Sequence, residues 1–99
     1  MNMSYARNVH FTLKSGKVEE FNRLMHAEVL PLLNTENGFR QNLTLLGGNV
    51  GMSISVWDDR ACADAYNTKT YPGILKKLGA VLDGTPRVET YDTMFTVIH

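Results

Sequence analysis

MSISVWDDRACADAY, residues 52–66, contains the end of one predicted element and the start of the next. Its first half alternates apolar and small polar residues, the period-2 pattern of a β-strand, and ends at Trp57. Asp58 and Asp59 then begin a helix, because a short carboxylate accepts hydrogen bonds from the free amides of the first turn and suits the positive end of the helix dipole. Small residues follow as far as Tyr66, so the stretch predicts a strand and a capped helix that lies close to a sheet.

Two elements precede this stretch. Residues 17–32 carry an apolar stripe at helical spacing, in which Pro31 lacks a backbone donor and predicts a kink or an early end. Gly38 suits a left-handed exit from that helix. Residues 5–13 alternate as a strand, with one apolar and one polar face: Val9, Phe11 and Leu13 against Asn8, His10 and Thr12.

The remaining elements complete a βαββαβ order. Residues 39–47 predict a second strand, which a Gly47-Gly48-Asn49 hairpin joins to the third. Pro72 is placed to begin a further helical turn, and residues 87–99 predict the last strand. This order is the ferredoxin-like α+β plan with a four-stranded antiparallel sheet. The length of 99 residues predicts one domain, 1–99. On the second strand, one face is expected to carry Phe39, Gln41, Leu43 and Leu45.

Four stretches, taken in order, resemble the antibiotic biosynthesis monooxygenase-like family: LKSGKVEEF (13–21), Gly38-Phe39, ISVWDDRACADAY (54–66) and VETYDTMF (88–95). The resemblance spans nearly the whole chain and implies a dimeric α/β barrel, in which two four-stranded sheets face each other and the helices lie outside. The residue pattern agrees with a homodimer, because the helices would cover the apolar sheet face and a partner sheet the polar one. That polar face is expected to carry Asn8, His10, Thr12, Ser53, Ser55 and Thr96.

The family also implies an activity. Its enzymes oxidise polycyclic phenols without metal or flavin, or open haem. The resemblance therefore implies a cofactor-independent monooxygenase, or a related enzyme, acting on an aromatic or enolisable compound. In such a reaction the conjugated anion of the substrate gives an electron to oxygen, while the protein binds it, excludes water and assists deprotonation. Haem degradation is disfavoured, because the position of its iron ligand falls near Lys76, so no cofactor is predicted.

The resemblance implies a pocket lined by Trp, Tyr, Asn and His side chains, which makes Asn8, His10 and Trp57 the candidate catalytic residues. His10 could act as a base with a near-neutral pKa, or be an imidazole buried and satisfied across a dimer. Trp57 could line the pocket or pack over the second helix. No metal site is predicted, because the histidines lack ligand spacing and there is a single cysteine. The candidate substrate-pocket residues are Tyr66, Tyr71, Tyr91 and His26.

The amino-acid composition limits the classes of binding partner and the cellular compartment that can be expected. Ten basic and ten acidic residues, without a block of like charge, argue against nucleic acid or an anionic membrane. The single cysteine, Cys62, suits a reducing compartment, and no signal-like or membrane-spanning apolar run is present, so a cytoplasmic protein is expected. A small-molecule ligand is the expected partner of the pocket. The alternative is a non-catalytic dimeric binding or structural module. Convergence of Asn8, His10 and Trp57 on one cavity would favour the enzyme, and their separation would favour the module.

Overall fold

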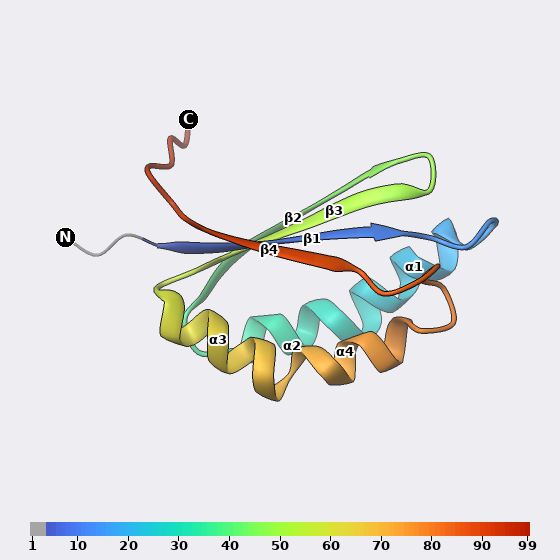
Figure 1. The fold of residues 1–99 in the computed structure, drawn as a ribbon, viewed down its shortest axis with the longest axis horizontal. Helices are drawn as coiled ribbons and strands as arrows, with labels where there is room; N and C mark the ends of the chain where they lie inside the picture. Colours follow the sequence, from blue (N-terminus) through green and yellow to red (C-terminus); the bar gives the residue numbers. More distant parts are fainter. Residues whose placement is uncertain (1–3) are drawn as a thin grey trace.

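The computed structural model of the protein describes residues 4–99. Its strands form one antiparallel sheet in the order β2-β3-β1-β4: β1 (Tyr5–Thr12), β2 (Phe39–Gly47), β3 (Val50–Trp57) and β4 (Arg87–Asp92). The helical segments are α1 (Val18–Leu24), η1 (Met25–Val29), α2 (Leu30–Thr35), α3 (Arg60–Lys69) and α4 (Tyr71–Leu78). All of them lie on the same side of the sheet, and its other face is bare (Figure 1). The predicted ferredoxin-like α+β fold is confirmed.

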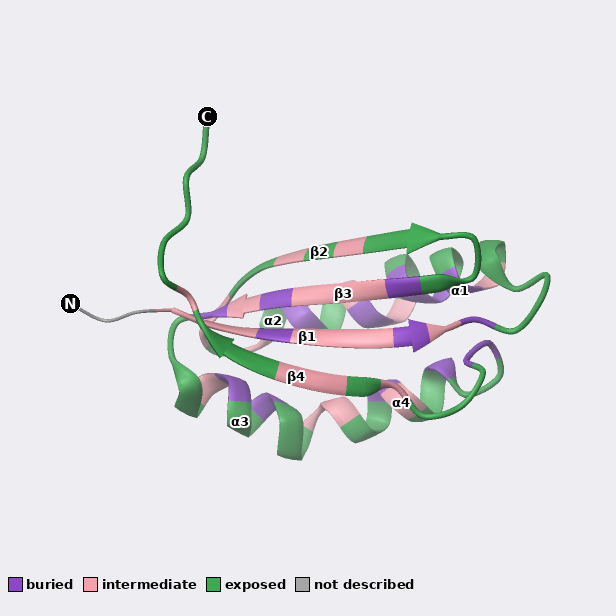
Figure 2. Cartoon of the chain, turned by 45° about the horizontal axis from the view of Figure 1, so that its top comes forward, coloured by how far each residue is buried: buried purple, intermediate pink, exposed green. Residues whose placement is uncertain are grey.

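The core lies between the sheet and the helices, where buried residues of both layers meet (Figure 2). Trp57, at the end of β3, is fully buried. The ring of Phe39 meets the ring of Trp57 edge-on, and the ring centres of Tyr66 and Trp57 lie 4.7 Å apart. These aromatic contacts fasten α3 to the end of the sheet. Within the helix itself only Ala63 and Tyr66 are buried, so most of its small residues face outward.

The first helical segment contains one wide turn of π-helix, η1. There the N–H of Leu30 donates to the carbonyl of Met25, five residues earlier. Pro31 has no N–H with which to continue the regular ladder. The predicted kink or early end is thus replaced by a π-turn, after which α2 continues to Thr35. Turns of this kind recur at functional sites, and this one buries Met25 and Val29.

The structure corrects the predicted face of β3. Ser53 lies opposite Val9 of β1, and Ser55 shares that face, so both serines point towards the helices rather than lying beside Asn8. The alternation of β3 could not decide this, because both of its faces carry large apolar residues. Trp57 lies on the helix-facing side of β3, whereas Ile54 and the apolar residues that share its face lie on the bare side of the sheet.

Two further strand predictions are wrong. An irregularity between Phe39 and Gln41 pairs Phe39 with Trp57 and Gln41 with Val56, so the two residues lie on opposite faces. In β4 the pairing ends at Asp92, and the predicted sheet position of Thr96 does not exist. The remaining apolar residues have no neighbouring strand within the described chain and are exposed: Met94, Phe95, Val97 and Ile98.

Gly38 makes the predicted left-handed exit, with φ of 80°. A Cβ at this position would lie 2.5 Å from Cys62 Sγ and 2.7 Å from Cys62 Cβ. Gly38→Ala is therefore expected to lower the free energy of unfolding by about 1–3 kcal/mol, measured by urea denaturation. Gly73→Ala is the control, because a Cβ at Gly73, in helix α4, meets nothing within 4 Å, and it should raise that free energy by about 0.4–1 kcal/mol. Equal effects of the two substitutions would contradict the close approach to Cys62.

Candidate functional site

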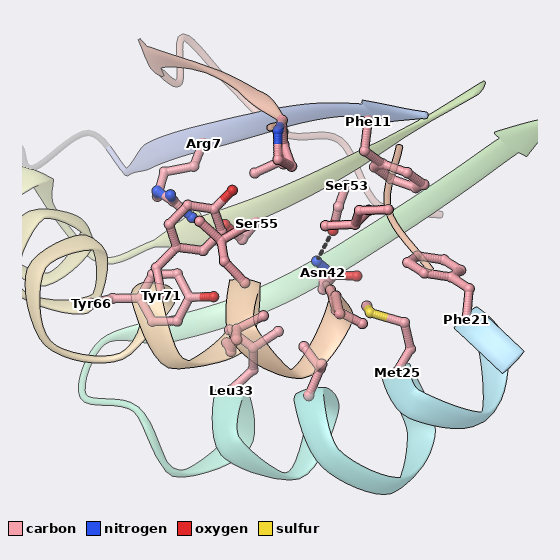
Figure 3. A pocket seen from close by; sticks show the side chains of 17 residues that line it. Arg7, Phe11, Phe21, Met25, Leu33, Asn42, Ser53, Ser55, Tyr66 and Tyr71 are labelled. Atoms are coloured by element: carbon pink, nitrogen blue, oxygen red, sulfur yellow. Dashed lines mark hydrogen bonds between the residues drawn. The ribbon is translucent and has the colours of Figure 1, made fainter. Parts of the chain in front are cut away.

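A cavity lies between the sheet and the helices, with about 50 Å³ open to the centres of water-sized molecules. Its floor is the helix-facing side of β1, β3 and β2, where four polar side chains lie: Arg7, Ser53, Ser55 and Asn42 (Figure 3). Its roof is apolar and includes Met25, Val29, Leu33, Ile74, Leu75 and Leu78. An apolar enclosure with a few polar groups on one wall is the usual form of a small-molecule site.

Arg7 is the charged residue of the cavity, and only 2% of it is exposed. Its Nη2 donates to Asn67 Oδ1 at 2.9 Å. The guanidinium carbon lies 4.5 Å from the ring centre of Tyr71 and 5.0 Å from that of Tyr66. Within residues 4–99 no carboxylate forms an ion pair with it. Burial lowers the pKa of Arg7, but an arginine stays protonated in proteins, so the site holds a desolvated cation that an anion would satisfy.

Tyr66 and Tyr71 lie against Arg7 and keep their protons. Burial raises the pKa of Tyr66 to about 12, although the charge of Arg7 opposes this. Burial also raises the pKa of Tyr71 above its usual value. The Tyr71 hydroxyl is out of contact with solvent, and no group in the described part of the chain forms a hydrogen bond with it. Both tyrosines can therefore donate to a ligand at neutral pH, and neither is a base.

The floor of the cavity is a row of polar side chains across three strands. Arg7, Ser55 and Asn42 are direct cross-strand neighbours on β1, β3 and β2. The Ser55 Oγ accepts from Trp57 Nε1 at 2.9 Å, which leaves the Ser55 hydroxyl hydrogen available. Asn42 Nδ2 donates to Ser53 Oγ at 2.9 Å. At the Arg7 end, the cavity thus offers donors, and donors aimed at one point stabilise a negatively charged oxygen.

The structure separates the three residues predicted to be catalytic. Trp57 lies on the helix-facing side, fully buried behind Tyr66. Asn8 and His10 lie on the bare face, because successive residues of a strand point to opposite sides. Asn8 Nδ2 donates to the sulfur of Met52 at 3.7 Å, on that same face. The three side chains therefore do not line one cavity, and their catalytic role stays a prediction.

Of the four residues predicted to line a substrate pocket, Tyr66 and Tyr71 line the cavity. Tyr91 lies exposed on the bare face, where its hydroxyl donates to Glu89 Oε2 at 3.0 Å. His26 is exposed on η1 and borders a separate groove beside β2. The structure thus brings two of the four side chains together, and both of their rings lie against the guanidinium of Arg7.

Arg7 is the cavity residue that sequence reasoning missed. In the alternation of β1, Arg7 falls on the same face as Val9 and Phe11. The sequence therefore places a charged residue on the apolar face of that strand. Charged side chains are seldom fully buried without a partner, and that position was therefore a detectable signal. Ser55 and Asn42 carried no such signal, because the pattern of β3 does not fix which of its faces meets the helices.

Among residues 4–99, no three His, Cys, Asp or Glu side chains gather in a way that could hold a metal ion. No helix in that range is both long enough and apolar enough to cross a membrane.

Asp59 caps α3, as the sequence predicts: its Oδ1 accepts from the Cys62 N–H at 2.9 Å. This backbone hydrogen bond lowers the pKa of Asp59. A carboxyl whose pKa is lower in the folded state stabilises it above the unfolded pKa, and this stability is lost as the pH falls through the folded pKa. Asp59→Ala should therefore lower the melting temperature at pH 7, and the gap to wild type should close in acid. A gap that is equally wide in acid, while Asp64→Ala changes little at either pH, would contradict the cap.

The chain is a ferredoxin-like α+β protein with a cavity between sheet and helices. No family model matches its sequence, and no curated protein matches it.

Solved structures share its fold. SnoaB, a cofactor-independent oxygenase from Streptomyces nogalater, is 18% identical with a TM-score of 0.78, over 98% of this chain and 99% of that one. A candidate antibiotic biosynthesis monooxygenase from Nitrosomonas europaea is 15% identical with a TM-score of 0.80, over 96% and 94%. A protein of unknown function from the same organism is 20% identical with a TM-score of 0.81, over 98% and 95%. The fold therefore agrees with the resemblance seen in the sequence.

Proposed function

We propose that the protein is a cofactor-independent monooxygenase that binds an aromatic or enolisable compound as its anion in the cavity. The observation that carries this proposal is Arg7, a buried guanidinium beside two tyrosine rings that has no carboxylate partner in the described chain. The fold supports the type of reaction, because proteins that share it include a cofactor-independent oxygenase.

Arg7 prepares the substrate by favouring its ionised form. A positive charge next to a phenol or enol lowers the pKa of that group, and a low-dielectric cavity strengthens the effect. The hydroxyls of Tyr71 and Ser55 donate to the same region of the cavity. Because neither tyrosine is a base, the substrate gives its proton to solvent as it binds, and Arg7 holds the oxygen anion that remains.

The substrate supplies all the electrons. Its anion passes one electron to dioxygen, and the resulting carbon radical and superoxide combine to form a carbon–oxygen bond. After protonation, the O–O bond of this peroxide breaks as the carbon loses a proton, so that a carbonyl and water form. A phenol and one O₂ thus give a quinone and one H₂O. The apolar side chains that line most of the cavity keep bulk water away from the radical pair.

One observation favours a second candidate function. Within residues 4–99, the cavity is lined by neither an imidazole nor a carboxylate, so it contains no conventional general base. A non-catalytic dimeric binding module would use the same cavity and release its ligand unchanged. The two functions then share a ligand and differ in whether oxygen is consumed.

Oxygen consumption separates the two functions. The protein is incubated with a panel of phenols, naphthols and quinols in an oxygen electrode, and products are analysed by mass spectrometry under ¹⁸O₂. The monooxygenase predicts uptake of one O₂ per product and one ¹⁸O atom in each product molecule. A ligand that is bound but unchanged, without oxygen uptake, would favour the binding module. Arg7→Met should abolish the uptake of oxygen, and Arg23→Met, which removes an exposed arginine of α1, is the matched control that should leave it unchanged.

The proposal includes a homodimer formed through the bare face of the sheet. Exposed apolar side chains cover part of this face, including Leu43 at 51% and Leu45 at 42%. Asn8 Oδ1 is buried there without a hydrogen-bond partner in the described chain. His10 Nε2 lies 2.9 Å from Glu89 Oε1, but not in the geometry of a hydrogen bond. A second sheet would cover the apolar groups and offer partners to the polar ones.

The proposal also keeps the expected cytoplasmic location. Its support is chemical: Cys62 is a free thiol, partly exposed, in a chain with no second cysteine. Reduced thiols of this kind persist in the cytosol.

A further inference from the structure

We propose that the ligand of the cavity is a one-ring aromatic oxyanion, such as a substituted phenolate, rather than a compound with several fused rings. The inference rests on the proposed function, since it names the substrate class of the same site. It comes from the size of the cavity, from the side chains that close its two ends, and from the unequal chemistry of its floor and roof.

The size of the cavity sets an upper limit on the ligand. Its volume of about 50 Å³ is roughly a third of the roughly 150 Å³ cavity known to hold one benzene molecule. A single ring therefore already requires the lining side chains to shift, and a second fused ring requires a much larger displacement of packed side chains.

Aromatic side chains limit the cavity at both ends. At one end Tyr66 is 5% exposed and is held between Trp57 and Arg7. At the other end the rings of Phe11 and Phe21 meet with their centres 5.0 Å apart (Figure 3). Buried aromatic residues in close contact move at a cost in packing, so neither end opens readily for a longer ligand.

The floor and the roof fix how such a ligand lies. The donors gather at one end, with Arg7 and Ser55 on the sheet and Tyr71 at the start of α4, whereas the rest of the roof is apolar, with side chains such as Val29 and Leu78. An ionised oxygen therefore belongs at the guanidinium, and the apolar remainder of the ring belongs under the helices. A sugar, a phosphate ester or an amino acid would bury polar groups under that roof without partners.

Isothermal titration calorimetry at a pH where the phenols are ionised tests the inference with three probes. They are 4-nitrophenolate, which has one ring; 4-nitro-1-naphtholate, which has two; and nitrobenzene, which has one ring without the oxyanion. We expect 4-nitrophenolate to bind at least tenfold more tightly than either of the others. Val29→Ala enlarges the roof and should narrow the difference between one ring and two. The wild-type comparison decides the matter if that variant does not fold.

Binding of the naphtholate as tight as that of the nitrophenolate would overturn the inference, as would equal binding of nitrobenzene or no binding of any probe. The outcome is separate from that of the proposed reaction. If the nitrophenolate binds but no phenol is oxidised, the ligand class stands and the monooxygenase fails. If a two-ring phenol is oxidised with incorporation of one ¹⁸O, the monooxygenase stands and the one-ring limit fails.

Discussion

Arg7→Met is expected to weaken the binding of phenolates at least about 100-fold and to leave the folded state no less stable than the wild type. The loss of binding follows from the removal of the charge that would meet the ligand oxygen; charged hydrogen bonds in buried sites account for losses of this size. Calorimetric titration of wild type and variant with the same phenolate measures it.

The stability part of this prediction has the opposite sign from that of an ordinary core substitution. Burying an ion costs several kcal/mol, and replacement of buried ions by apolar side chains of similar volume is often neutral or stabilising. Against this, Met loses the hydrogen bond to Asn67 and the contacts with Tyr66 and Tyr71, each worth about 0.5–2 kcal/mol. We therefore expect the free energy of unfolding to stay equal or to rise by about 1 kcal/mol.

Two further variants sharpen the comparison. Arg7→Lys keeps a positive charge but not the flat guanidinium that lies against the tyrosine rings, so its affinity should fall between those of wild type and Arg7→Met. Arg23→Met should change neither affinity nor stability by much, because Arg23 is an exposed residue of α1. A loss of more than about 2 kcal/mol of stability in Arg7→Met would show that Arg7 serves the fold rather than a ligand.

Leu43→Asp is expected to convert the proposed homodimer into a monomer at micromolar concentration. Leu43 lies opposite Ile54 on the bare face of the sheet and is half exposed in the single chain, so the substitution leaves the core intact. In a two-fold symmetric dimer the new carboxylate occurs twice, and each would be buried without a partner. The dissociation constant should rise at least about 100-fold.

Light scattering during size-exclusion chromatography gives the result. Wild type should elute with twice the chain mass of 11.1 kDa, and Leu43→Asp with the chain mass itself. Leu32→Asp is the control, because Leu32 is an exposed leucine of α2 on the opposite side of the molecule. A monomeric wild type, or a Leu43→Asp variant that stays dimeric, would exclude this face as the interface.

The order of elements was predictable because each boundary carried a local signal. Asp59 caps α3, Gly38 has the positive φ of a helix exit, and Pro72 lies in the first turn of α4. The alternation on β1 also identified its helix-facing side correctly, since Val9 and Phe11 both border the cavity. These signals depend on a few neighbouring residues, which the sequence contains in full.

The faces of the other strands were not predictable in the same way. Ile54 and Trp57 lie on opposite faces of β3, so the strand is apolar on both sides and its own pattern fits either orientation. Only the pairing with β1 decides, and it places Ser55 beside Arg7 at the floor of the cavity. In most sheets with one covered face, apolar and polar residues alternate along a strand and so identify the buried face. When the uncovered face is also apolar, this alternation is lost.

The candidate site was only half predictable for a related reason. Tyr66 and Tyr71 were identified because the family resemblance implies a pocket lined by Trp, Tyr, Asn and His side chains. Asn8 and His10 stood out as polar residues in an apolar strand. The polar residue of β1 that borders the cavity is instead Arg7, on the opposite face of the strand. Its importance depends on the absence of a carboxylate nearby in space, which a sequence does not show.

The ionisation of a bound phenol tests most directly whether the cavity holds an anion at Arg7. The absorbance of 4-nitrophenolate is followed against pH, free in solution and with saturating protein. A positive charge beside the oxygen should lower the pKa of the bound phenol by about one unit or more, and Arg7→Met should abolish this decrease. Burial without a charge partner acts in the opposite direction, so an unchanged or raised pKa of the bound phenol in the wild type would contradict the account.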